Sequence, residues 1–255
     1  MEVHRDMDLK DETPIMRVLH LLTRLAQQDS LSLEQAHLLT GLSKATLTRA
    51  FLSLEHAGWA HRYLGNDQYT YLPPEDSSPH TPAIVKKRLA VLAKPILQGL
   101  HHMTGLSTDF AVMFDELEIV ESSFGLTDSR LGKRVVIGLG VNLEHSSMGK
   151  AYSAALSGEH QSGQYYVRTK HFWDYKELKQ IFNISAIAIP LICQQTPIGA
   201  LNLAWFDSDE SSYDEDDIAN RFLPALQHAV ECLIDRIQQS DLNRYVCHSG
   251  CDATP

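Results

Sequence analysis

The group of residues best suited to binding chemistry is the segment 43–55, SKATLTRAFLSLE. Leu47 and Leu54 fall at helical spacing, which predicts a helix with one buried face. The opposite face carries small hydroxyl side chains and two bases, Lys44 and Arg49. Such side chains at the start of a helix can bond base edges and phosphates in the major groove of DNA. An ordinary solvated face would have the same composition, so the neighbouring elements must decide.

We expect this segment to be the third of three helices, followed by a β-hairpin. Ser32 and Gln35 stand at capping-box spacing at the start of the second helix, and Gly41 is suited to end it. Three helices with a three-residue turn before the third, followed by a hairpin, predict a winged helix-turn-helix. The expected elements are helices from Pro14 to about 28, from 33 to 40 and from 43 to 56, and strands at 59–63 and 68–72.

Charge gives the DNA-binding prediction little support. The chain has a formal net charge of −10, whereas affinity for DNA comes largely from Lys and Arg on phosphates. Within residues 13–72, however, five Lys and Arg side chains stand against four Asp and Glu side chains, so the acids are concentrated elsewhere. DNA binding is therefore predicted from pattern. The side chains expected to contact DNA are Ser43, Lys44, Ala45, Thr46, Thr48, Arg49 and Arg62.

A stretch with four prolines in ten residues, 73–82, predicts a stiff linker between two domains. A helix is expected at 83–103, with Pro95 kinking or splitting it. The remainder mixes strands and helices, which predicts an α+β sensor domain with an antiparallel sheet. The predicted domains are 12–73, 74–104 for the linker and its helix, and 105–242. The expected strands are 107–114, 117–122, 135–137, 185–193 and 198–206, and the expected helices are 147–156, 175–182 and 214–239.

Three segments, in this order, resemble the IclR family of bacterial transcription regulators. The first is TGLSKAT at 40–46, continued by Arg49, Leu54-Glu55 and Gly58-Trp59, with Ala45 where the family usually has Ser. The second is SSMGKA at 146–151, similar to the family's T-A-x-G-K-A. The third pairs IAIPL at 187–191 with IGALNL at 198–203. The stretch between Leu156 and Ser185 is shorter than in the family, which puts one wall of its ligand pocket in doubt.

The resemblance implies a GAF-like effector domain with a ligand pocket between its sheet and its helices. Gly149 lies near an expected helix start, where free amides favour an anion and a glycine lets a ligand approach. Asp109 and Asn202 interrupt apolar strands and either face solvent or line the pocket. An aromatic or other small carboxylic acid is the leading ligand hypothesis. The expected effector contacts are Asp109, Met148, Gly149, Lys150, Ala151, Ala188, Asn202 and Ala204.

Several classes of protein are not expected. No apolar run is long enough to span a membrane, and residues 1–14 lack the apolar core of a secretion signal, so a cytoplasmic protein is predicted. We expect neither cofactor nor metal, because no metal-spaced cluster, G-x-S-x-G motif or phosphate loop occurs. The expected partners are double-stranded DNA with a pseudo-palindromic operator, a small carboxylate effector, and further copies in a homodimer or homotetramer. The alternatives are a GAF-type sensor or adaptor without DNA binding, and a redox enzyme using Cys193 or Cys232.

Overall fold

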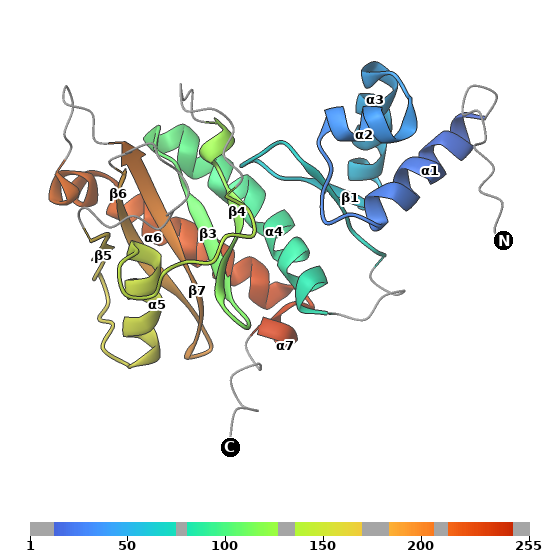
Figure 1. The fold of residues 1–255 in the computed structure, drawn as a ribbon. Coiled ribbons are helices and arrows are strands. Elements are labelled where there is room, and N and C mark those ends of the chain that lie inside the picture. Colours follow the sequence, from blue (N-terminus) through green and yellow to red (C-terminus); the bar gives the residue numbers. More distant parts are fainter. Residues whose placement is uncertain (1–12, 75–80, 127–135, 170–183, 207–213, 247–255) are drawn as a thin grey trace. The chain divides into compact units, whose positions relative to one another are not determined.

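The computed structural model describes residues 13–74, 81–126, 136–169, 184–206 and 214–246. The chain divides into two compact units (Figure 1). Unit 1 comprises Met1–Tyr63 and Asp67–Pro79. Unit 2 comprises Leu64–Asn66 and His80–Pro255. No described helix is long and apolar enough to cross a membrane.

Unit 1 contains three helices and a two-stranded antiparallel hairpin. They are α1 (Pro14–Ala26), α2 (Leu33–Thr40), α3 (Lys44–His56), β1 (Ala60–Arg62) and β2 (Tyr69–Tyr71). The predicted capping box is present: the Ser32 hydroxyl accepts from the Gln35 amide at 3.1 Å, and the Gln35 side chain accepts from the Ser32 amide at 2.8 Å. The helix starts were thus predicted correctly, because caps are local features, while both strands are shorter than expected.

The core of unit 1 lies between α1, α3 and the hairpin. Leu21, Leu25, Leu47 and Phe51 are fully buried, and they come from the apolar stripes of α1 and α3. The Phe51 ring stacks on Tyr69 of β2 with centroids 3.9 Å apart and an interplanar angle of 7°. This packing fixes the inner face of α3, so its polar residues face outward.

Unit 2 is built on a five-stranded antiparallel sheet in the order β4-β3-β7-β6-β5. Gln194 and Gln195, both with positive φ, form the tight turn between β6 and β7, where Cys193 already pairs with Thr196. The strands are β3 (Asp109–Met113), β4 (Leu117–Ser122), β5 (Tyr166–Val167), β6 (Ile184–Cys193) and β7 (Thr196–Phe206).

Helices cover both faces of this sheet (Figure 1). On one face, α4 (Pro82–Thr104) and α6 (Glu215–Gln239) pack on large side chains such as Ile187 and Leu203. On the other face, α5 (Ser147–Leu156) packs on small side chains such as Ala188 and Ala200. The structure is therefore the mixed helix and antiparallel-sheet fold that the sequence predicts, with three layers in unit 2.

Some expected elements differ from the structure. Helix α4 runs unbroken through Pro95, whose ring is exposed, so of the kink or split expected there the split does not occur. The strand expected at 135–137 is wrong for its described residues, because Val136 and Ile137 enter a turn at Gly138, which has φ 83°. The helix expected at 175–182 lies outside the described residues. Strand β5, the 3-10 turn Phe124–Leu126 and helix α7 (Asn243–Val246) were not expected.

Candidate functional site

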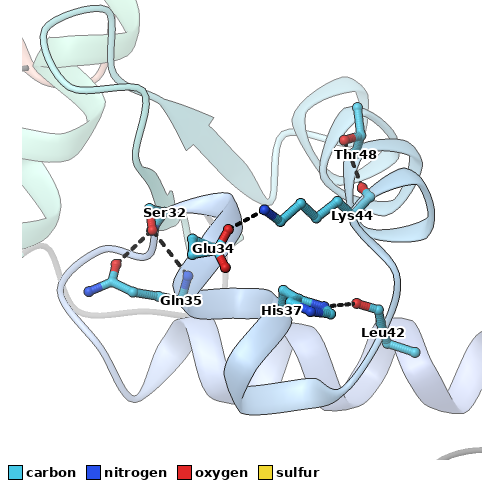
Figure 2. Close-up of polar contacts among 7 residues, drawn as sticks. All are labelled: Ser32, Glu34, Gln35, His37, Leu42, Lys44 and Thr48. Atoms are coloured by element: carbon cyan, nitrogen blue, oxygen red, sulfur yellow. Dashed lines mark hydrogen bonds and ion pairs between the residues drawn. The ribbon is translucent and has the colours of Figure 1, made fainter.

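A short, tightly bonded turn sets the start of α3 against the end of α2. Gly41 closes α2 with φ 66°, and its amide donates to the His37 carbonyl at 2.9 Å. The His37 ring nitrogen Nδ1 lies 2.6 Å from the Leu42 carbonyl oxygen, a contact drawn as a dashed line in Figure 2. The Thr40 hydroxyl donates to the Ala36 carbonyl at 2.7 Å. Side chains of α2 thus hold the turn, and they fix where α3 begins.

The polar face of α3 is exposed as predicted, but its hydroxyls are partly occupied. The Ser43 hydroxyl caps the helix by accepting from the Thr46 amide at 3.2 Å, and it lies 2.9 Å from the Thr46 hydroxyl. The Thr48 hydroxyl donates to the Lys44 carbonyl at 2.9 Å. Ser43, Lys44, Ala45, Thr46, Thr48 and Arg49 are all exposed and lie together at the first turns of α3.

Two of the three predicted basic contacts are held by acids of the same unit. The Lys44 ammonium forms a close ion pair with Glu34 on α2 (Figure 2). The Lys44 hydrogen bond lowers the pKa of the Glu34 carboxyl, and desolvation opposes that shift. Arg62 donates to Asp67 across the hairpin at 2.8 Å. Arg49 is exposed, and no acidic partner is found for it within the described part of the chain.

Unit 2 contains a cavity of about 90 Å³ on the face of its sheet that α5 covers. For comparison, an engineered apolar cavity of about 150 Å³ is known to hold benzene. The cavity is smaller than that, so only a ligand smaller than benzene fits it as it stands, and an aromatic ligand would require it to open further. Its walls are Ser107, Asp109, Ile119, Phe124, Val136, Gly140, Val141, Ser146, Ser147, Met148, Arg168, Ile184, Ala186, Asn202, Ala204 and Trp205.

The space arises from small residues on one face of the two long strands. Ala186 pairs with Ala204 across β6 and β7, and Ala188 pairs with Asn202. Large residues alternate with them and point to the α4 and α6 side, because successive strand residues face opposite ways. Small side chains toward α5 leave room between sheet and helix, and this room is the cavity.

Two bonded polar side chains, half-buried Asp109 and buried Asn202, line the cavity. Asp109 accepts from the Ser122 hydroxyl at 2.6 Å and from the Asn202 side-chain amide at 3.0 Å. In return, the Asp109 backbone amide donates to Asn202 Oδ1 at 2.6 Å. Burial raises the pKa of the Asp109 carboxyl, and the two side-chain hydrogen bonds oppose that shift. Asp109 and Asn202, predicted separately, are thus one bonded pair across β3 and β7.

The opposite wall carries groups that favour an anion. Helix α5 begins here, and amides in its first turn, at Ser147 and Met148, have no acceptor within the helix. The Ser146 hydroxyl caps the Gly149 amide at 2.9 Å. Arg168, which follows β5, brings a positive charge to the same cavity. Trp205 also lines the cavity, although it belongs to the core cluster on the α4 and α6 side; its indole Nε1–H is buried and lacks a hydrogen-bond partner among the described residues.

Half of the predicted effector residues line the cavity, namely Asp109, Met148, Asn202 and Ala204. Gly149, Lys150, Ala151 and Ala188 do not. A Cβ on Gly149 would lie 2.1 Å from the Asn142 carbonyl oxygen, so the chain itself, and not a ligand, occupies the space beside this glycine. The Lys150 ammonium donates to the Val167 carbonyl at 3.1 Å.

Sequence reasoning missed Arg168, Trp205 and the serines at the start of α5. The alternation of small and large residues in β6 and β7 was a signal for the cavity. Nothing in the sequence indicates that Arg168 lies at the cavity, because its place there depends on the pairing of β5 with β6. Within the described ranges, no group of three or more His, Cys, Asp and Glu side chains is placed to hold a metal ion.

No family model and no curated protein matches this chain. Many of the solved structures similar to it are IclR family transcriptional regulators. One from Brucella abortus is 17% identical, with 92% of this chain and 96% of that chain covered and a TM-score of 0.46. A putative regulator of the same family from Silicibacter sp. is 17% identical, with 88% and 96% covered and a TM-score of 0.45.

A third similar structure is an IclR homologue from Microbacterium hydrocarbonoxydans in complex with 4-hydroxybenzoate. It is 13% identical, with 89% of this chain and 100% of that chain covered and a TM-score of 0.43. These structures belong to the family that the motifs resemble. At such identities and scores the similarity decides nothing about function, which must be inferred from the residues of this chain.

Proposed function

We propose that this chain is a ligand-responsive, DNA-binding transcription regulator of the IclR type. Residues 12–73 would form a winged helix-turn-helix, 74–104 the linker and its helix, and 105–242 a GAF-like effector domain. The observation that carries the proposal is the exposed first part of α3. It presents Lys44, Thr46 and Arg49 directly after a turn that α2 holds in place.

Two positively charged side chains of α3, Lys44 and Arg49, could contact DNA. Arg49 would read a base edge or clamp a phosphate, and Lys44 would contact a phosphate once released from Glu34. One helix reads too few bases for useful specificity, so we infer a homodimer or homotetramer on a pseudo-palindromic operator. The protein would work in the cytoplasm, where its operator lies.

The cavity in unit 2 supports a small carboxylate as the effector. A carboxylate would accept from the free amides of α5 and pair with Arg168. At the other wall, Asp109 and Asn202 would face the polar or aromatic end of the same molecule. The ligand's apolar part would rest on Ile119 and Met148. Control of a catabolic operon by a small carboxylic acid is the biological role that fits this chemistry, and an aromatic acid would require the cavity to open further.

DNA binding is tested with a duplex covering the region upstream of the gene, at low and moderate salt. We expect salt-dependent binding that Arg49→Ala weakens at least about tenfold, the loss typical of one specific arginine contact. Arg24→Ala, which removes an exposed arginine of α1, is the matched control and should change affinity by less than about twofold. Failure to bind any sequence at either salt concentration would leave a sensor or adaptor without DNA binding.

Effector binding is tested by thermal shift with acetate, benzoate and 4-hydroxybenzoate. A ligand at about 100 times its Kd should stabilise the protein by about 2.7 kcal/mol. The Arg168→Gln variant should lose this stabilisation, whereas Lys150→Gln should keep it because Lys150 lies outside the cavity. Equal losses in both variants, or no shift with any of these acids, would contradict a carboxylate effector at this place.

A further inference from the structure

The cation at the first position of α3 already has an anionic partner. Lys44 forms its ion pair with Glu34, which stands in the first turn of α2 (Figure 2). The side chains are 56% and 57% exposed, so neither is locked by packing, and water or a phosphate can reach both. Ten positions separate the two residues in the chain, and the turn held by His37 brings them together.

This pairing matters because of where the two helices stand in a helix-turn-helix. The first helix of such a pair crosses the DNA backbone, and the start of the second helix enters the major groove. Glu34 therefore lies where a backbone phosphate would approach, and its carboxylate offers Lys44 the same charge as a phosphate oxygen. The hydroxyls beside Lys44, on Ser43 and Thr48, are bonded within α3 and do not replace its charge.

We propose that Glu34 acts as an internal phosphate mimic that competes with DNA for Lys44 and so lowers sequence-independent affinity. This inference rests on the proposed DNA binding. Nonspecific binding is almost wholly electrostatic, whereas specific binding adds contacts to base edges. An acid that occupies Lys44 removes one of the few phosphate contacts on which nonspecific binding depends. Glu34 is thus a residue that limits background binding to DNA.

The size of the effect follows from the exposure of the pair. An exposed ion pair stabilises by at most about fivefold in an equilibrium constant. Removal of Glu34 also removes its repulsion of nearby phosphates. We therefore expect Glu34→Gln to tighten nonspecific binding about fivefold, with most of the gain depending on Lys44. Both side chains are exposed, so neither substitution removes core packing.

A double-mutant cycle tests this coupling in the full chain. The probe is a fluorescein-labelled 30-base-pair duplex of mixed sequence, with anisotropy measured at two KCl concentrations. The variants are Glu34→Gln, Lys44→Gln and the double substitution, and Asp29→Asn changes the charge equally at an exposed site of unit 1. We expect Glu34→Gln to tighten binding about fivefold with Lys44 present and less than about twofold without it. Asp29→Asn should stay within about twofold of the wild type.

Each other outcome is informative. Equal tightening by Glu34→Gln in both backgrounds, or as much tightening by Asp29→Asn, would mean general charge repulsion and would overturn the inference. No tightening by Glu34→Gln would overturn it as well. These results leave the proposed DNA binding intact. By contrast, no salt-dependent binding by the wild type or any variant would refute the proposed function, and the inference with it.

Discussion

Gly149 and Gly99 both lie inside helices of unit 2, yet alanine should have opposite effects at the two positions. At Gly149 in α5, an added Cβ would lie 2.1 Å from the Asn142 carbonyl oxygen and 2.5 Å from the Leu143 Cα. Both are backbone atoms, so relief requires the chain to move. At Gly99 in α4, an added Cβ has no neighbour within 4 Å. The higher helix propensity of alanine should therefore stabilise the helix only at position 99.

Magnitudes follow from these contacts. Alanine in place of glycine inside a helix stabilises by about 1 kcal/mol. Overpacking costs about 1–3 kcal/mol, and a collision with backbone on this scale belongs at the upper end. We therefore expect Gly149→Ala to destabilise by about 2 kcal/mol and Gly99→Ala to stabilise by up to about 1 kcal/mol. For a unit of this size, 1 kcal/mol shifts Tm by about 2–4 °C.

Thermal unfolding followed by circular dichroism measures both variants beside the wild type. Tm should fall by about 4–8 °C for Gly149→Ala and rise by up to about 4 °C for Gly99→Ala. A neutral or stabilising Gly149→Ala would refute the close packing of α5 on residues 142–143, next to the cavity of unit 2. A fall of similar size in Gly99→Ala would show that steric contact is not what separates the two sites.

Three further predictions concern the buried groups. Because burial raises the pKa of the Asp109 carboxyl, its charged form opposes folding. Asp109→Asn should therefore gain Tm over the wild type as pH rises above about 4. Phe51→Ala should cost about 3–5 kcal/mol in urea unfolding of unit 1, against less than about 1 kcal/mol for the half-exposed Leu52→Ala. A carboxylate that binds in the cavity should change the fluorescence of Trp205, and Trp205→Phe should abolish that change.

Each of these three predictions has an outcome that would contradict it. A stability advantage of Asp109→Asn that is constant from pH 4 to 8 would show that the carboxyl does not titrate against folding. Equal losses for the two α3 variants would contradict the burial of Phe51 against the hairpin. A fluorescence change that persists in Trp205→Phe would place the ligand elsewhere.

Local chemistry explains why the helices of unit 1 were predicted closely. The Ser32–Gln35 box and the left-handed Gly41 act within a few residues, so their effect is visible in the sequence. In unit 2, β6 and β7 were recognised by length and apolar character, but β5 has only two residues and depends on pairing with β6. The turn at Gly138 replaced a short apolar run that resembled a strand.

In the candidate sites, too, local features were predicted and contacts between elements were not. Exposure of α3 follows from helical periodicity, and it was predicted. The ion pair between Lys44 and Glu34 was not, because it joins two helices across a turn. Asp109 and Asn202 were singled out as polar residues in apolar strands, yet their bond to each other depends on the order of strands in the sheet. Contacts between different helices and strands were known only from the structure, whereas helix caps and apolar stripes were visible in the sequence.

The strand order of unit 2 also governs when this chain can fold. Strand β3 pairs with β7, so Phe110 meets Leu201 only after most of the unit has been synthesised. Unit 1, by contrast, has its last strand complete at Tyr71. During translation, the helices and strands of unit 1 are all synthesised early. The β3–β4 hairpin is synthesised long before β7, so one edge of β3 stays unpaired until β7 is made. Until β7 is made, β3 and β6 both lack the strand that lies between them, so their backbone edges can pair with other chains.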